Sequence, residues 1–229
     1  MKISILGVPI DKINMDEAAK RAEALFGYDG VSMIFTPNPE IIMLAQGNAK
    51  LQNALESADL CLPDGIGVVI ASRIMKKPLQ ERVAGFDFLM KMMDKGYKTF
   101  LLGARGDVVK RAAERLENVV GFRDGYFGED ETESIIKQIN DSKAEFLVVG
   151  LGAPKQELWI YENREKLACK VAMGVGGCID VIAGEVKRAP KLWQKLCLEW
   201  LYRAVKEPKR FGRLMVLPKF IIQVIVNSE

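Results

Sequence analysis

The sequence of 229 residues contains no histidine. Histidine is the side chain that most often accepts a proton near neutral pH, so a general base in this protein must be a carboxylate, or a Lys, Cys or Tyr with a perturbed pKa. The four cysteines form no C-x-x-C pair, and without histidine they are a poor zinc-binding set. We therefore interpret them as reduced cytosolic thiols, most of which fill the core.

Long hydrophobic runs are also absent. No apolar segment approaches the roughly 18 residues of a membrane-spanning helix, and the short run at 3–8 is followed by Pro9 and Asp11, which is unlike a signal peptide. The composition, with 49% apolar and 28% charged residues, is ordinary for a soluble globular protein. We therefore expect one large domain, or one domain with an appendage.

Charge is distributed unevenly, although the net charge is only +3. Residues 187–219 contain ten basic and two acidic residues, which leaves this segment at +8, whereas the first 186 residues contain 23 basic and 27 acidic residues. Such a tail attracts phosphate on a lipid, a nucleic acid or a small ligand. Since the tail carries no recognised DNA- or RNA-binding motif, we expect no nucleic-acid partner.

Aromatic and aliphatic residues alternate with the basic residues of this tail, and an apolar run follows at 220–226. This pattern is typical of a segment that lies on an anionic membrane surface. A helical hairpin that packs on the body, with its lysines facing water, would give the same pattern.

Hydrophobic patterning predicts strands that alternate with helices. The expected strands are a hairpin arm at 1–10 and buried strands at 31–35, 60–62, 99–102, 145–149 and 171–173. The expected helices are 14–26, 41–45, 50–57, 66–75, 86–95, 107–117, 131–139 and one that ends at 161. This alternation predicts a Rossmann-like α/β fold, in which a mostly parallel sheet has helices on both faces. We expect residues 1–190 to form this body and residues 191–229 to form a basic helical C-terminal appendage.

Five predicted strands end in polar or glycine-containing loops, at 36–38, 63–65, 103–106, 150–156 and 174–177. Because the carboxyl ends of parallel strands share one edge, we expect these loops to meet there. Glycine at a strand-to-helix turn lets backbone N–H groups approach an anion, which favours a nucleotide diphosphate, although glycine also serves turn geometry alone. No loop is a strict G-x-G-x-x-G or a P-loop.

Asp64 is the carboxylate that this arrangement presents most directly. Pro63 stops strand pairing, and Gly65 and Gly67 allow a sharp turn, so that Asp64 lies at a strand's carboxyl end. In a chain without histidine this carboxylate is a candidate general base. The alternative is that Asp64 only caps the helix expected at 66–75.

Six ordered motifs carry a resemblance to a known family. They are Thr36-Pro-Asn-Pro-Glu, Pro63-Asp-Gly, Glu81-Arg-Val-Ala-Gly-Phe-Asp, Gly152-Ala-Pro-Lys-Gln-Glu, Gly174-Val-Gly-Gly and Leu198-Glu-Trp-Leu-Tyr-Arg. In this order the chain resembles the WecG/TagA/CpsF glycosyltransferases over residues 5–218, most closely the branch that transfers N-acetylmannosamine.

The resemblance implies an inverting transfer of N-acetylmannosamine from UDP-N-acetylmannosamine (UDP-ManNAc) to the 4-hydroxyl of N-acetylglucosamine (GlcNAc) on undecaprenyl diphosphate. This reaction builds the linkage unit of wall teichoic acid at the cytoplasmic face of the cell membrane. It further implies that Asp64 is the base, that Thr36 and Gln156 serve activity, and that tail arginines bind the lipid diphosphate. Those arginines are Arg203, Arg210 and Arg213.

Further residues are candidates for binding the nucleotide or the substrate. They are Asn38, Arg82, Gly103, Tyr126, Gly150, Gly152, Gly176, Gly177 and Asp180. Three of them have simpler interpretations: Arg82 would pair with Glu81 or Asp87, Tyr126 would fill the core, and Asp180 would be a surface acid.

The sequence is also compatible with other functions and partners. The same family contains an enzyme that uses the uronic acid of this sugar, and the oligomeric state is not fixed by the sequence. A nicotinamide oxidoreductase would need the missing G-x-G-x-x-G, and a non-catalytic adaptor would leave the five loops unexplained. Many glycosyltransferases hold UDP through a metal on Asp-x-Asp, which this chain lacks. We therefore expect a reaction without metal or cofactor.

Overall fold

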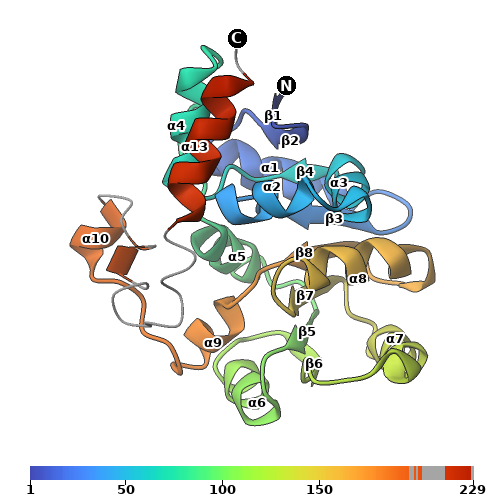
Figure 1. The fold of residues 1–229 in the computed structure, drawn as a ribbon. Coiled ribbons are helices and arrows are strands. Elements are labelled where there is room, and N and C mark those ends of the chain that lie inside the picture. Colours follow the sequence, from blue (N-terminus) through green and yellow to red (C-terminus); the bar gives the residue numbers. More distant parts are fainter. Residues whose placement is uncertain (196–198, 200, 203–214, 228–229) are drawn as a thin grey trace.

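The computed structural model describes residues 1–195, 199, 201–202 and 215–227. A parallel six-stranded sheet forms its centre, in the order β4-β3-β8-β7-β5-β6 (Figure 1). Its strands are β3 (Ser32–Phe35), β4 (Leu60–Cys61), β5 (Thr99–Gly103), β6 (Val119–Arg123), β7 (Phe146–Gly150) and β8 (Val171–Gly174). A separate antiparallel hairpin joins β1 (Lys2–Ile5) to β2 (Val8–Asp11).

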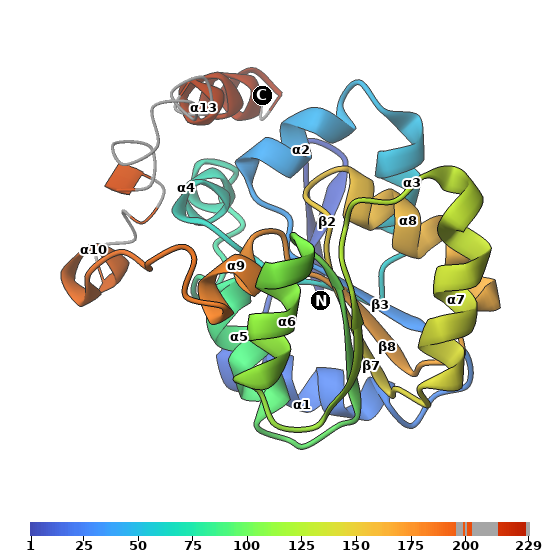
Figure 2. The same ribbon diagram turned by 90° about the horizontal axis from the view of Figure 1, so that it is seen from below.

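Helices cover both faces of the sheet, as the Rossmann-like prediction requires (Figure 2). One core packs the sheet against α1 (Met15–Leu25), α5 (Gly85–Met93), α6 (Gly106–Glu114) and α9 (Cys178–Ile182). The other core packs it against α2 (Pro39–Ala45), α3 (Ala49–Glu56), α4 (Ile66–Ile74), α7 (Thr132–Asp141) and α8 (Lys155–Asn163). Successive residues of a strand alternate between these cores: Met33 and Phe35 enter one, and Ile34 enters the other.

The strands and helices predicted up to residue 173 are confirmed, and β6 is the strand of this region that the prediction omits. Asn14 caps α1 through a capping box with Glu17, as the spacing of these two residues indicates. The omitted element is β6, an edge strand whose residues alternate between half-buried and exposed positions. Cys61 and Cys169 are buried as expected, and burial raises the pKa of both thiols to about 12.

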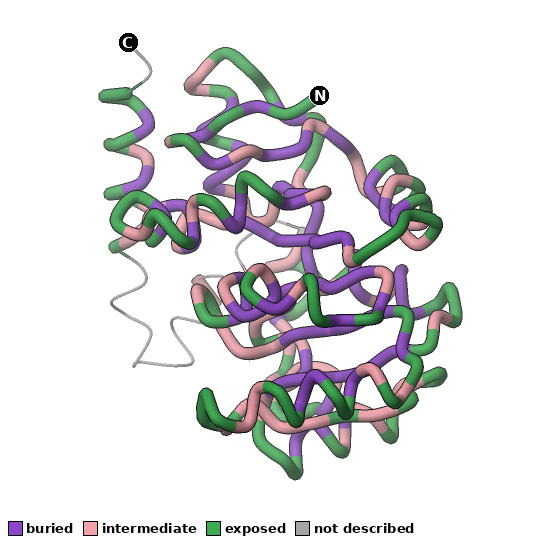
Figure 3. The backbone as a smooth tube through the Cα atoms, turned by 90° about the vertical axis from the view of Figure 1, so that its right-hand side faces the viewer, coloured by how far each residue is buried: buried purple, intermediate pink, exposed green. Residues whose placement is uncertain are grey.

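The C-terminal segment returns to the body. After the short helix α10 (Lys191–Lys195), helix α13 (Val216–Val226) packs on α2 and α4, beside which it runs in Figures 1 and 2. Figure 3 shows the buried and exposed positions that alternate along this helix: Phe220 and Val224 are buried, whereas Ile222 and Val226 are exposed. Leu217 of this helix lies against Gly67 of α4, because a Cβ added to Gly67 would be only 2.6 Å from the Cδ1 atom of Leu217. In the part of the chain that is described, no helix has the length and hydropathy needed to cross a bilayer.

Candidate active site

Two pockets adjoin at the carboxyl edge of the sheet. One has a volume of about 860 Å³ and lies over β5, β6 and β7, and the other has about 650 Å³ and lies over β3, β4 and β8. We call them the β6-side and the β4-side pocket. Both are lined by Gly152, Gly176, Gly177 and Asp180. Gly152, Gly176 and Gly177, which the sequence singles out, therefore form the wall between two neighbouring pockets, and Asp180 is part of this wall.

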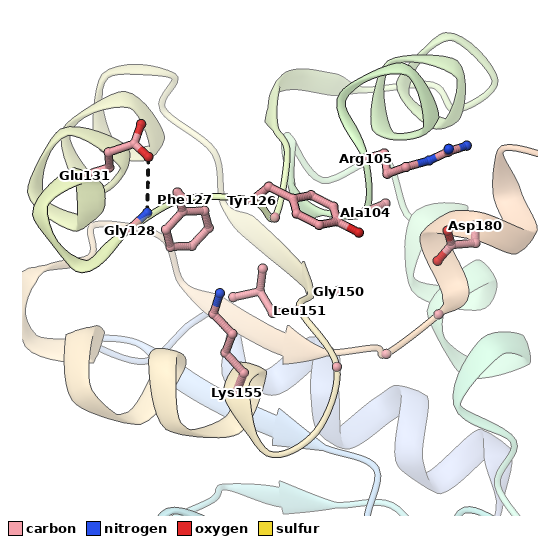
Figure 4. Close-up of a pocket in the computed structure, with 14 residues that line it drawn as sticks. Ala104, Arg105, Tyr126, Phe127, Gly128, Glu131, Gly150, Leu151, Lys155 and Asp180 are labelled. Atoms are coloured by element: carbon pink, nitrogen blue, oxygen red, sulfur yellow. Dashed lines mark hydrogen bonds between the residues drawn. The ribbon is translucent and has the colours of Figure 1, made fainter. Parts of the chain in front are cut away.

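The β6-side pocket has an exposed aromatic ring and a lysine at its rim (Figure 4). Tyr126 follows β6 and is 76% exposed, so the alternative that it fills the core is wrong. Lys155 rises from the first turn of α8, with its Nζ 4.9 Å from the centre of the Phe127 ring. Arg105 also lines the pocket, but its guanidinium is 3.0 Å from Glu185. This pocket offers an aromatic face, cationic groups and glycine backbone.

Asp64 and Thr36 both line the β4-side pocket, and the side chains of both lie next to Gly85. A Cβ on Gly85 would lie 3.1 Å from Thr36 Cγ2 and 3.6 Å from Asp64 Oδ2, so glycine keeps space for both side chains. Asp64 does not cap α4, because Gly65 occupies the cap position and no side chain bonds there. The capping alternative is therefore wrong, and the carboxylate faces the pocket.

Asp64 lies in an environment that favours its protonated form. Burial raises the pKa of this carboxyl above its usual range because the charged form loses water. Arg82 and the backbone N–H groups of Gly85 and Gly65 oppose the rise, and Glu199 adds to it. A carboxylate with a raised pKa is a stronger base, which suits proton abstraction near neutral pH.

Arg82 pairs with neither of its predicted partners. Its Nη2 lies 3.0 Å from an oxygen of Glu199, which comes from the C-terminal segment 117 residues later. Asp87 instead binds Arg188, and Glu81 accepts a hydrogen bond from the Met15 backbone N–H. The ion pair therefore ties the C-terminal segment to the edge of the β4-side pocket.

Gln156 is buried and holds the wall between the pockets. Its Oε1 accepts a hydrogen bond of 2.8 Å from the Gly176 N–H, and its Nε2 donates one of 2.8 Å to Glu157. Glu157 is completely buried, and burial raises the pKa of its carboxyl. Gln156 thus fixes a glycine loop that both pockets share.

The remaining candidates divide into three groups. Asn38 lines the β4-side pocket and caps α2 by accepting a hydrogen bond from the Ile41 N–H, and Gly150 lines the β6-side pocket. Gly103 lines neither pocket: it has φ +142°, and a Cβ there would lie 2.4 Å from the Gly150 carbonyl oxygen, so its role is close backbone packing. The three tail arginines lie outside the described residues.

Several residues that line the pockets are not among the candidates predicted from the sequence. Gly85 and Glu199 lie within two of the six motifs that carry the family resemblance, and this position is the sequence signal that could have identified them. Val216 and Leu217 of α13 also line the β4-side pocket, and nothing in their local sequence indicates this. In the described part of the chain, no group of three or more His, Cys, Asp and Glu side chains is arranged to hold a metal ion.

This fold and site define a class. A parallel α/β sheet that presents glycine-lined loops, a half-buried carboxylate and two adjoining pockets at its carboxyl edge is typical of nucleotide-dependent enzymes. More specifically, the chain belongs to the glycosyl transferase WecG/TagA/CpsF family, whose sequence profile matches residues 3–228. The family predicted from the six motifs is thereby confirmed.

Curated relatives agree with this assignment. A protein of Bacillus spizizenii (strain W23) is 38% identical over 208 residues, which cover 86% of this chain and 80% of the relative. Proteins of Staphylococcus aureus strains MW2 and NCTC 8325 are each 35% identical over 234 residues, covering 97% of this chain and 92% of the relative. All three are named N-acetylglucosaminyldiphosphoundecaprenol N-acetyl-beta-D-mannosaminyltransferase.

Proposed function

We propose that this protein transfers N-acetylmannosamine from UDP-ManNAc to the 4-hydroxyl of GlcNAc on undecaprenyl diphosphate, with inversion at the anomeric carbon. The observation that carries the proposal is the half-buried Asp64 carboxylate, which lines a pocket that adjoins a second, glycine-lined pocket. The names of the relatives supply the sugar and the acceptor. Building the linkage unit of wall teichoic acid is the corresponding cellular role.

In this proposal each of the two pockets binds a different substrate. The β6-side pocket takes the UDP of the donor, with Tyr126 against the base and Lys155 near phosphate. The β4-side pocket takes the acceptor sugar, so that its 4-hydroxyl faces Asp64. The donor's anomeric carbon then lies at the shared wall of Gly152, Gly176 and Gly177.

The reaction in this arrangement is a single displacement. Asp64 takes the proton of the acceptor 4-hydroxyl while the oxygen of that hydroxyl forms a bond to the anomeric carbon. The bond from this carbon to the phosphate oxygen breaks, and UDP leaves with the electron pair. Negative charge develops on the leaving phosphate, where cations such as Lys155 stabilise it. Thr36 and Gln156 shape the pocket around the two sugars.

We further propose that residues 1–190 form the catalytic body and residues 191–229 an appendage that associates with the membrane. Ile222, Ile225 and Val226 of α13 are exposed and apolar, and the surrounding segment is basic. Such a surface suits peripheral binding to anionic lipid at the cytoplasmic face of the cell membrane. Arg203, Arg210 and Arg213 would contact the lipid diphosphate, because guanidinium groups bind phosphate oxygens in pairs.

Calorimetry with UDP and with NAD tests the nucleotide assignment. We expect UDP to bind and NAD not to bind, and we expect Tyr126→Ala to weaken UDP binding while Tyr28→Ala, at another exposed tyrosine, leaves it unchanged. Base stacking on an aromatic ring contributes about 1–3 kcal/mol, so the loss is about 5- to 150-fold in Kd. Binding of NAD in preference to UDP would contradict the proposal.

A further inference from the structure

A row of alternating charges leads from the Asp64 carboxylate to the surface. Arg82 Nη2 is 3.0 Å from Glu199 Oε2, and the other oxygen of Glu199 is 3.5 Å from Arg188 Nε. Arg188 also binds Asp87 through contacts of 2.6 and 3.2 Å. The side chains of Arg82 and Glu199 are only 14% and 15% exposed, so solvent screens this pair weakly.

The row joins three separate parts of the chain. Arg82 stands in the loop before α5, Arg188 follows α9, and Glu199 belongs to the C-terminal segment. Helix α13 has its own attachment to the body through the buried Phe220 and Val224. The ion pairs of Glu199 are therefore a second, separate link between the C-terminal segment and the body.

We infer that Glu199 is a positioning residue of the proposed transfer reaction, which holds the Arg82 guanidinium and so limits its pull on the Asp64 carboxylate. The role of Glu199 in catalysis rests on the proposed function, in which Asp64 is the general base. By this arrangement the C-terminal segment completes the electrostatic environment of the base.

The physical reason is the balance of charge around Asp64. An arginine near a carboxylate stabilises the ionised form and weakens the base, whereas a second carboxylate opposes this. Glu199 has two effects on Asp64. It forms an ion pair with the Arg82 guanidinium, and its own negative charge disfavours ionisation of Asp64. Among the described residues, the charged side chains that line this pocket are Glu40, Asp64, Arg82, Asp180, Arg188 and Glu199.

The test is Glu199→Gln in the full chain, which preserves the shape of the side chain and removes its charge. The matched control is Glu162→Gln, which removes the same charge from an exposed pair with Lys50. Carbon-13 NMR of carboxyl groups follows the titration of Asp64, whose signal is assigned by its loss in Asp64→Asn. Turnover against pH and hydrogen exchange of residues 216–226 complete the set.

We expect Asp64 to titrate at lower pH in Glu199→Gln than in the wild type, with turnover reduced about three- to tenfold because a weaker base accelerates less. Glu162→Gln should change neither quantity, and exchange in α13 should stay as in the wild type. Asp64 titrating at the same pH in both proteins would overturn the inference. So would faster exchange in α13, since Glu199 would then be an anchor only.

The NMR titration needs no sugar donor, so it separates this inference from the proposed function. If the wild type fails to transfer N-acetylmannosamine while the titration shifts as expected, the choice of substrate is wrong and the coupling of Glu199 to Asp64 stands. If transfer succeeds and the titration does not move, the coupling is wrong and the function stands.

Discussion

Replacing Gly103 by alanine tests the close backbone packing that the structure shows at this residue. The new Cβ would lie 2.4 Å from the oxygen, 2.6 Å from the carbon and 2.8 Å from the Cα of Gly150, all of which are backbone atoms that cannot move aside. Overpacking of this kind costs about 1–3 kcal/mol. The backbone at φ +142° adds about 1–3 kcal/mol for a residue with a side chain. We therefore expect a total loss of about 2–6 kcal/mol.

Gly152→Ala is the matched control, because Gly152 also has a positive φ, of +77°, but no atom lies within 4 Å of the place that a Cβ would take there. This variant should lose only the backbone contribution, about 1–3 kcal/mol. Urea unfolding followed by circular dichroism measures both variants, and with a slope of about 2–3 kcal/mol/M the Gly103 midpoint should fall by roughly 0.7–3 M. Equal midpoints for the two variants, or a Gly103→Ala protein as stable as wild type, would refute the packing argument.

The remaining predictions concern the chemistry and the C-terminal helix. Asp64→Asn should reduce turnover by about 10²–10⁴-fold while UDP affinity measured by calorimetry stays near wild type; turnover within a few-fold of wild type would remove Asp64 as the base. Since the pKa of Asp64 is raised, the acid limb of the wild-type kcat/KM profile should lie above the pH at which an ordinary aspartate titrates, and a limb at or below that pH would contradict this. With no Asp-x-Asp pair and no histidine, turnover should survive excess EDTA, whereas loss that Mg²⁺ or Mn²⁺ restores would reveal a metal site. Phe220→Ala should destabilise the contact of α13 with the body by about 3–5 kcal/mol and speed hydrogen exchange in that helix, while Ile222→Ala, at an exposed position, should do neither.

The sequence was sufficient to place the main site residues together. Thr36 and Asp64 each follow a buried strand, and Gly176 follows a third, so a parallel sheet brings all three to one edge. The motif that contains Gln156 begins at the end of a fourth strand. This reasoning uses only the order and direction of strands, which hydrophobic patterning reveals well.

Contacts between distant segments could not be predicted in the same way. From the sequence, the expected ion-pair partners of Arg82 were its near neighbours Glu81 and Asp87. In the folded chain Arg82 pairs with Glu199, which is 117 residues away. The apolar run at 220–226 suits a membrane surface as well as a packed helix, and only the structure shows Phe220 buried beside exposed residues. Edge strand β6 was missed because its alternation is weak and Gly121 interrupts it.

The measurement that tests the central claim most directly is sugar transfer by the purified full chain with a panel of UDP-sugars. The acceptor is GlcNAc on a short-chain polyprenyl diphosphate, and the product is identified by mass and by the NMR of its new anomeric centre. We expect UDP-ManNAc to be used in preference to UDP-GlcNAc and to the uronic acid form of UDP-ManNAc, and the product to carry a β linkage to the 4-hydroxyl. Preference for another donor, or a product with the α configuration of the donor retained, would contradict the account.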